Sequence, residues 1–189
     1  GKAVDTRLVL KGDLSRFPFR DPQDGSFRVA ARLRDGQLDY APGWPKIDGV
    51  AGELIFEGAG MTVKAQRGRI LGVDLKDVSA VLPDFETDAV ITIRGAAEGP
   101  TPDFLRFIAE SPVSGMINHF TDPFRAEGRG KLDLQLVLPL HKMEHSRVKG
   151  DYQFARNQLQ PDPSMPVLTE ASGRVEFTES QLNVRNGVA

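Results

Sequence analysis

Apolar and polar residues alternate over most of the chain with a period of two, which is typical of β-strands. The clearest run is "GKLDLQLVLPL", where five leucines fall on one side of a predicted strand: Leu132, Leu134, Leu136, Leu138 and Leu140. Shorter runs repeat the pattern, with Leu54 and Phe56 in "GELIFEG" and Ile91 and Ile93 in "AVITIRG". Gly, Asp and Asn interrupt the runs about every 8 to 12 residues, which indicates hairpins in an antiparallel sheet.

Two further runs carry information about the faces of this sheet. "SFRVAARLR" places apolar residues on one side and three arginines on the other, which we interpret as a solvated face: Arg28, Arg32 and Arg34. "RILGVDLKDVSAVL" has apolar residues at Leu71, Val73 and Leu75, and the phase then shifts before Val78 and Val81.

Residues 101–121 depart from the strand pattern. In "TPDFLRFIAE", Phe104, Phe107 and Ile108 have helical spacing, Thr101 is a suitable N-cap and Pro102 suits the first helical position. "SPVSGMINHF" repeats this start signal and the apolar spacing. The segment therefore predicts two short amphipathic helices that pack on the sheet or its end.

The chain also contains an internal repeat. "WPKIDGVAGELIFEGAGMTV" and "MPVLTEASGRVEFTESQLNV" begin at Trp44 and Met165 and align without a gap, at an offset of 121 residues. Proline and glycine recur at equivalent positions, which constrains the backbone and not only the hydrophobicity. The shared positions are Pro45/Pro166, Gly52/Gly173, Phe56/Phe177 and Val63/Val184. We interpret each copy as the same building unit, with Trp44 as an anchor at its start.

Composition narrows the function classes. The 189 residues carry a net charge of −2, which gives no general attraction to nucleic acid. There is no cysteine, so disulfide and thiolate chemistry are excluded. No apolar run reaches the roughly 18 residues that a membrane-spanning helix needs.

No pattern predicts a catalytic residue, a metal site or a cofactor. His141 and His145 have the i, i+4 spacing of metal ligands on a helix, but they lie between two strand runs and we interpret them as solvated turn residues. Asp84, Glu86 and Asp88 form a local acidic turn, and neither a nucleophile elbow nor a phosphate loop is present.

The five-leucine stripe permits two interpretations. A second sheet could cover it as a packed core. Alternatively, a sheet that curls without closing could use it as a trough for acyl chains, since each methylene removed from water contributes about 0.8 kcal/mol. Period-two alternation does not distinguish these interpretations.

Several strings resemble the central region of YhdP-type proteins, which belong to the AsmA-like group with TamB as a distant relative. The most specific are Phe17–Phe19, the string from Leu38 to Pro45 that ends in Trp-Pro, and the pair Ser111–Pro112. The likeness extends over nearly the whole chain, and the second copy departs from it at Met165-Pro166.

The resemblance implies a non-enzymatic, periplasmic segment of a large protein anchored in the inner membrane of a Gram-negative bacterium. Such proteins are implicated in moving phospholipids to the outer membrane and in its permeability barrier. The expected fold is mostly β, an antiparallel, strongly curved sheet that forms an open hydrophobic groove with a short helical insert. Residues 1–100 would form one groove unit, 101–121 the insert, and 122–189 a second unit truncated at its C-terminus.

The lipid-binding residues expected from the stripe and the resemblance are Leu54, Phe56, Ile91, Ile93, Leu132, Leu134, Leu136 and Leu138. Expected partners are phospholipid, neighbouring repeats of the same parent chain and envelope proteins, with no nucleic acid and no cofactor. One alternative is a non-catalytic β-scaffold or envelope-assembly module that pairs through strand edges. Another is a carbohydrate-binding domain, suggested by Tyr40, Trp44 and the local acids.

Overall fold

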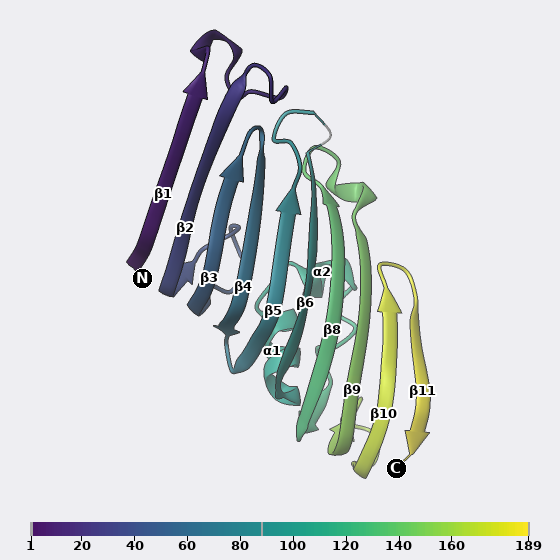
Figure 1. The fold of residues 1–189 in the computed structure, drawn as a ribbon. Coiled ribbons are helices and arrows are strands. Elements are labelled where there is room, and N and C mark those ends of the chain that lie inside the picture. The colour runs from purple at the N-terminus through teal and green to yellow at the C-terminus, as the bar shows by residue number, and fades with distance from the viewer. Residues whose placement is uncertain (1, 88, 189) are drawn as a thin grey trace.

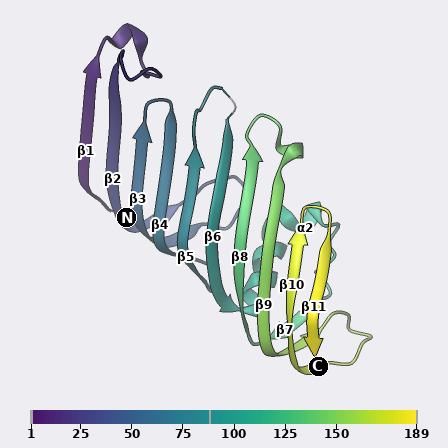
Figure 2. The ribbon, with the colours of Figure 1, turned by 45° about the vertical axis from the view of Figure 1, so that its right-hand side comes forward.

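The computed structural model describes residues 2–87 and 89–188, which form one open antiparallel sheet of eleven strands (Figure 1). Neighbouring strands follow the order β1-β2-β3-β4-β5-β6-β8-β9-β10-β11, and the short β7 pairs with β9. A pair of short helices lies against one side of the sheet (Figure 2). The mostly β, antiparallel and unclosed architecture predicted from the sequence is confirmed.

The strands are β1 (Lys2–Gly12), β2 (Gly25–Leu38), β3 (Ile47–Glu57), β4 (Gly60–Ile70), β5 (Val73–Leu82), β6 (Val90–Pro100), β7 (Arg125–Glu127), β8 (Arg129–Pro139), β9 (Arg147–Gln160), β10 (Leu168–Thr178) and β11 (Leu182–Val188). The helices are α1 (Thr101–Ala109) and α2 (Val113–Met116), with 3₁₀ turns η1 (Leu14–Arg16) and η2 (Met143–His145). We call the edge that carries the β1–β2, β5–β6 and β8–β9 connections the upper edge, and the opposite one the lower edge (Figure 1).

The helical insert follows the prediction with two differences. α1 begins at Thr101 itself, after Pro100, so Thr101 is the first helical residue and its side chain makes no cap. α2 ends at Met116, although the apolar spacing predicted a helix that continues to Phe120. Asn118 and His119 have φ of 51° and 59°, a left-handed backbone that ends helices.

The run from Arg69 to Leu82 is two strands and not one. β4 ends at Ile70 and a turn through Leu71, with φ of 52°, leads into β5 at Val73. The predicted phase shift is real, because Asp77 has φ of 48° and the register with β6 shifts there. Beyond this shift Ala80 lies opposite Ile93, whereas Val81 pairs with Thr92 and is exposed.

Irregularities of this kind cross most of the sheet. Residues with a left-handed backbone, φ between 48° and 61°, occur in seven strands, toward the lower edge: Asp5, Asp35, Gly49, Asp77, Arg156, Glu170 and Asn186. Strand pairing shifts beside these positions, as expected for β-bulges. Each bulge adds one residue to its strand, bends it and increases its twist. The sheet therefore carries a band of bulges, which we call the bulge band.

The two copies of the internal repeat share their backbone conformation and their strand register. Asp35 and Arg156 have φ of 53° and 54°, and Gly49 and Glu170 have φ of 61° and 56°, at the sequence offset of the two copies. Strand pairing repeats at the same offset in these pairs: Leu33↔Gly52 and Phe154↔Gly173, Ala31↔Leu54 and Tyr152↔Val175, Leu54↔Val63 and Val175↔Val184. The hairpins β2–β3–β4 and β9–β10–β11 therefore share one register.

The equivalent glycines of the two copies give a stability prediction. A Cβ at Gly52 would lie 2.1 Å from the Lys64 carbonyl oxygen, whereas at Gly173 the nearest atom is in the Phe154 ring, 3.2 Å away. We expect Gly52→Ala to lower the free energy of unfolding by about 2 kcal/mol, because the backbone must move. Gly173→Ala should cost clearly less, because a side chain can yield. Urea unfolding of both variants checks this, and equal losses would contradict it.

Candidate functional site

Strand pairing aligns apolar residues in a transverse row across seven strands. Residues directly opposite each other in antiparallel strands share a face of the sheet. The row consists of Ala31, Leu54, Val63, Ala80, Ile93, Leu136 and Val148, each paired with the next. We call the side of the sheet that carries this row the apolar face.

A second row lies nearer the lower edge and reaches β11. It consists of Leu75, Ala97, Leu132, Tyr152, Val175 and Val184. Toward the upper edge, Ile91 pairs with Leu138, and Phe56 pairs with Met61. The structure therefore brings all eight residues predicted to bind lipid to the apolar face. Sequence reasoning did not select their partners Val63, Ala80 and Val148, although the period-two runs contain them.

The middle of the apolar face is half-buried. All eight residues predicted to bind lipid are partly exposed, whereas Val73 and Leu82 are each only 2% exposed. Buried apolar side chains occur toward the two edges, such as Phe19 near the upper edge and Val50 near the lower edge. The leucine register ends with β8, since Leu140 lies beyond it and is 45% exposed. The stripe therefore lacks the burial of a core covered by a second sheet.

Aromatic rings cover two glycines of the apolar face. A Cβ at Gly130 would meet the Tyr152 ring, and one at Gly150 would meet the Phe177 ring, both closer than 3 Å. The rings therefore lie over glycines of neighbouring strands, an arrangement that compensates for a missing side chain. Glycine at both positions is required by this close approach.

The opposite face carries charge. Between β2 and β3, Arg28 Nε lies 3.8 Å from Glu57 Oε2, and Arg32 Nε lies 3.3 Å from Glu53 Oε1. Lys76 and Glu98 form a similar pair at 2.9 Å between β5 and β6. These side chains are substantially exposed, so each pair contributes little to stability. The predicted solvated face is confirmed for Arg28 and Arg32, and Arg34 is exposed as well.

Near the lower edge, α1 packs against both copies of the repeat. The ring centroids of Phe107 and Trp44 are 5.9 Å apart, and those of Trp44 and Tyr40 are 6.0 Å apart. Phe104 makes an edge-on contact with Tyr152, at 5.1 Å. Trp44 thus anchors the first copy to the helix, in agreement with its predicted role at the start of the unit.

A buried polar network fixes the start of α1. Asn157 is fully buried, its Nδ2 donates to Thr101 Oγ1 at 2.7 Å, and its Oδ1 accepts from the Arg129 amide at 3.1 Å. The hydroxyls of Thr101 and Tyr152 are 2.7 Å apart. Burial raises the pKa of Tyr152, so this hydroxyl stays neutral. Thr101, which the sequence marked as a cap, instead joins the helix to β9.

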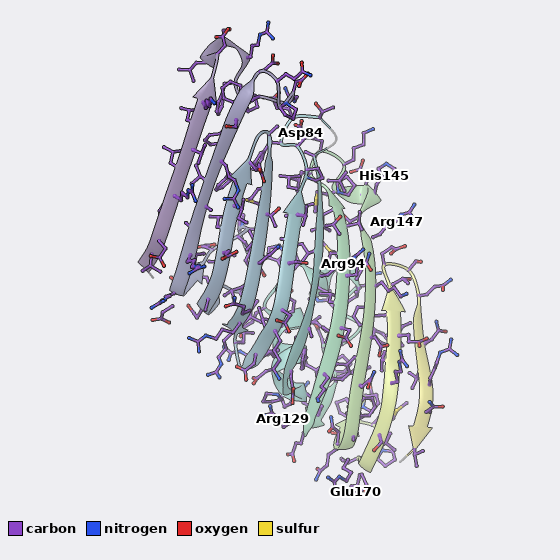
Figure 3. All side chains as sticks on the ribbon, viewed as in Figure 1. Asp84, Arg94, Arg129, His145, Arg147 and Glu170 are labelled. Carbon is purple, nitrogen blue, oxygen red and sulfur yellow. The ribbon has the colours of Figure 1, made fainter. Side chains whose placement is uncertain are left out.

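At the upper edge, an ion-pair cluster joins the β1–β2 and β5–β6 connections. Arg20 donates to Asp84 at 3.0 Å and to Glu86 at 2.8 Å, and Asp84 lies at the top of the sheet (Figure 3). The Arg20 guanidinium, helped by the amides of Thr87 and Glu86, holds the pKa of Asp84 well below its usual value. Two carboxylates of the predicted acidic turn therefore form ion pairs with Arg20. The third acidic residue of the turn, Asp88, lies outside the described residues.

This cluster predicts a small pH dependence. Because the folded-state pKa of Asp84 is lowered, its contribution is present above the unfolded value of about 3.9 and is lost as the pH falls through the lower folded value. We expect Asp84→Asn to lower the urea midpoint slightly at pH 7, with the difference from wild type shrinking below about pH 4. Urea titrations at several pH values check this; a difference that grows in acid would contradict it.

The described residues hold one cluster with the composition of a catalytic triad, but its geometry differs. Ser114 Oγ and the Asp122 carboxylate both contact Nδ1 of His119, at 2.9 and 3.1 Å. A triad needs the serine and the carboxylate on different ring nitrogens. His141 and His145 lie in the connection between β8 and β9, and no group of potential metal ligands occurs within residues 2–87 and 89–188.

Comparisons with known proteins identify the family. A family model described as YhdP protein matches residues 1–188. The chain belongs to the YhdP family. The Escherichia coli (strain K12) member described as "Intermembrane phospholipid transporter YhdP" is 26% identical over 182 residues. The match covers 96% of this chain and 14% of that YhdP protein.

No solved structure matches this YhdP-family chain. Within its described residues, no helix has the length and hydrophobicity needed to cross a bilayer. The YhdP family thus includes a member described as an intermembrane phospholipid transporter.

Proposed function

We propose that this chain is a segment of a bridge-like lipid transporter whose apolar face carries phospholipid acyl chains across the periplasm, from the inner to the outer membrane. The observation that carries the proposal is the row from Ala31 to Val148, seven half-buried apolar residues on seven neighbouring strands. The description of the E. coli relative as an intermembrane phospholipid transporter supports it.

The physical basis is a dry surface that needs no directional contacts. Acyl chains would lie on the apolar face while head groups stay in water, and each methylene removed from water contributes about 0.8 kcal/mol. Because adjacent positions of the face are chemically alike, a chain can move between them without losing a specific bond. In this proposal the chain has no catalytic role, and it is a periplasmic part of an inner-membrane-anchored protein of a Gram-negative bacterium.

The division into units belongs to the same proposal. Residues 1–100 and 122–189 would be two consecutive units of one lipid-bearing surface, and residues 101–121 an insert between them. The shared register of β2–β3–β4 and β9–β10–β11 supports this division.

The direct test uses phospholipids that carry a photoreactive group on an acyl chain. After loading and irradiation of the purified chain, we expect crosslinks at residues such as Leu136 and Ile93, and few at the opposite face. Native mass spectrometry should also find phospholipid bound before loading. A lipid-free protein that takes up no photoreactive lipid would overturn the proposal, and it would favour the scaffold alternative if strand edges crosslink to envelope proteins instead.

A further inference from the structure

The two copies of the repeat contain the same turn in different surroundings. In the first copy the Trp44 amide donates to the Ala41 carbonyl at 3.2 Å, and in the second the Met165 amide donates to the Asp162 carbonyl at 2.9 Å. These positions are equivalent at the repeat offset. Trp44 is half-buried against Phe107 of α1, whereas Met165 is 54% exposed. The first turn therefore has a helix against it and the second leaves the equivalent side chain open.

The second turn exposes more apolar surface than Met165 alone. Val167 is 49% exposed and Leu168 is 39% exposed, whereas the equivalent residues of the first copy are the charged Lys46 and the half-buried Ile47. Val167 also forms part of the wall of a cleft of about 500 Å³ beside α1. We call these three residues, Met165, Val167 and Leu168, the second-turn patch.

We propose that the second-turn patch binds a short amphipathic helix, with an aromatic residue in the place of Phe107, supplied by a further unit of the same polypeptide. α1 shows what such a helix does: Phe107 packs on Trp44 of one copy and Phe104 packs on Tyr152 of the next. The helix thus joins consecutive units, and the second-turn patch is the half of that contact left without its helix.

The same polypeptide is the expected source for two reasons. Along the chain, α1 follows the first turn after four strands, so the helix that contacts a turn comes from sequence further on. In addition, this chain matches only 14% of the length of its E. coli relative, so a family member has room for further units. The inference concerns the lower edge of the sheet and holds whether or not the apolar face carries lipid.

Photocrosslinking in the natural full-length polypeptide tests the inference. With p-benzoylphenylalanine at position 165, we expect intramolecular crosslinks to a peptide outside residues 1–189 that has an aromatic residue at helical spacing. The matched control is the same substitution at position 44, which should crosslink to the peptide that contains Phe107. Crosslinks from position 165 only to lipid, to a second molecule or to nothing, with a working control, would overturn the proposal.

A stability comparison gives a second readout that does not depend on crosslinking. In the 189-residue chain, Trp44→Ser should lower the melting temperature by about 5 °C, because it removes a ring packed on α1, whereas Met165→Ser should change it by less than about 1 °C. In the full-length polypeptide, Met165→Ser or Val167→Lys should increase the rate of proteolysis several-fold near the crosslinked helix. Unchanged proteolysis with both variants would also contradict the proposal.

Discussion

Leu136→Asp is expected to remove bound phospholipid while the sheet stays folded. Leu136 is the sixth of the seven residues in the first row, paired with Ile93 and Val148 on its two sides. Because it is half-buried, a carboxylate at this position can reach water and need not unfold the protein. An acyl chain over it would have to desolvate the charge, which costs several kcal/mol, so we expect loading to fall at least about tenfold.

The matched control is Gln135→Asp, one residue away on the opposite face. Gln135 pairs with Arg94 and Lys149, so a carboxylate there meets two cations and should leave lipid loading unchanged. Native mass spectrometry measures the bound lipid, and circular dichroism verifies the fold. If Leu136→Asp and the uncharged Leu136→Ser both unfold the chain, the leucine is core and the lipid-bearing role is wrong. Retained lipid in a folded Leu136→Asp variant would contradict it equally.

Asn157→Ala should produce the largest loss of stability among polar substitutions. Asn157 is the only fully buried polar side chain among the described residues, and its loss leaves the Arg129 amide and the Thr101 hydroxyl short of a partner. Unsatisfied buried groups cost about 1 to 3 kcal/mol each, and the lost volume adds to this. We expect the free energy of unfolding to fall by about 3 kcal/mol, measured by urea denaturation.

The exposed Gln153, on the same strand, supplies the control. Gln153→Ala should change stability by less than about 0.5 kcal/mol, as is usual for surface positions. Hydrogen exchange should show the difference locally, with faster exchange in α1 for Asn157→Ala only. If exchange in α1 is unchanged while stability falls, the network does not hold the helix as inferred.

The sequence carried enough information to identify the strands and the alternation of apolar and polar residues along them. Period-two runs identified the strands, and the glycine and proline positions of the repeat predicted a shared backbone, which the common register confirms. The eight residues expected to bind lipid lie on one face, because the alternation from which they were chosen is a local property of each strand. What covers a face is not local, so alternation could not decide between packed core and open surface; the structure adds that Leu134 and Leu136 are only half-buried.

The bulges were mostly beyond prediction for a related reason. Only the phase shift near Asp77 was visible in the sequence, because apolar residues stand on both sides of it. Arg156 and Glu170 have left-handed backbone without the glycine that usually marks it. The role of Asn157 was hidden as well, because its partners come from α1 and the start of β8, far away in the chain.

Bulges occur at equivalent positions in the two copies of the repeat, and this determines the shape of a sheet that is lengthened by further copies. From β2 to its equivalent β9 there are six strand spacings of about 4.8 Å each, so one repeat period lengthens the sheet by roughly 30 Å. Since the bulges recur at equivalent positions, each added period would bend its strands in the same way, four residues nearer the lower edge, because the first row reaches β9 at Val148 whereas the equivalent of Ala31 is Tyr152. The sheet could then gain length while the shape of its cross-section stays the same. A whole unit could be inserted or deleted without changing the surface that a bound molecule contacts.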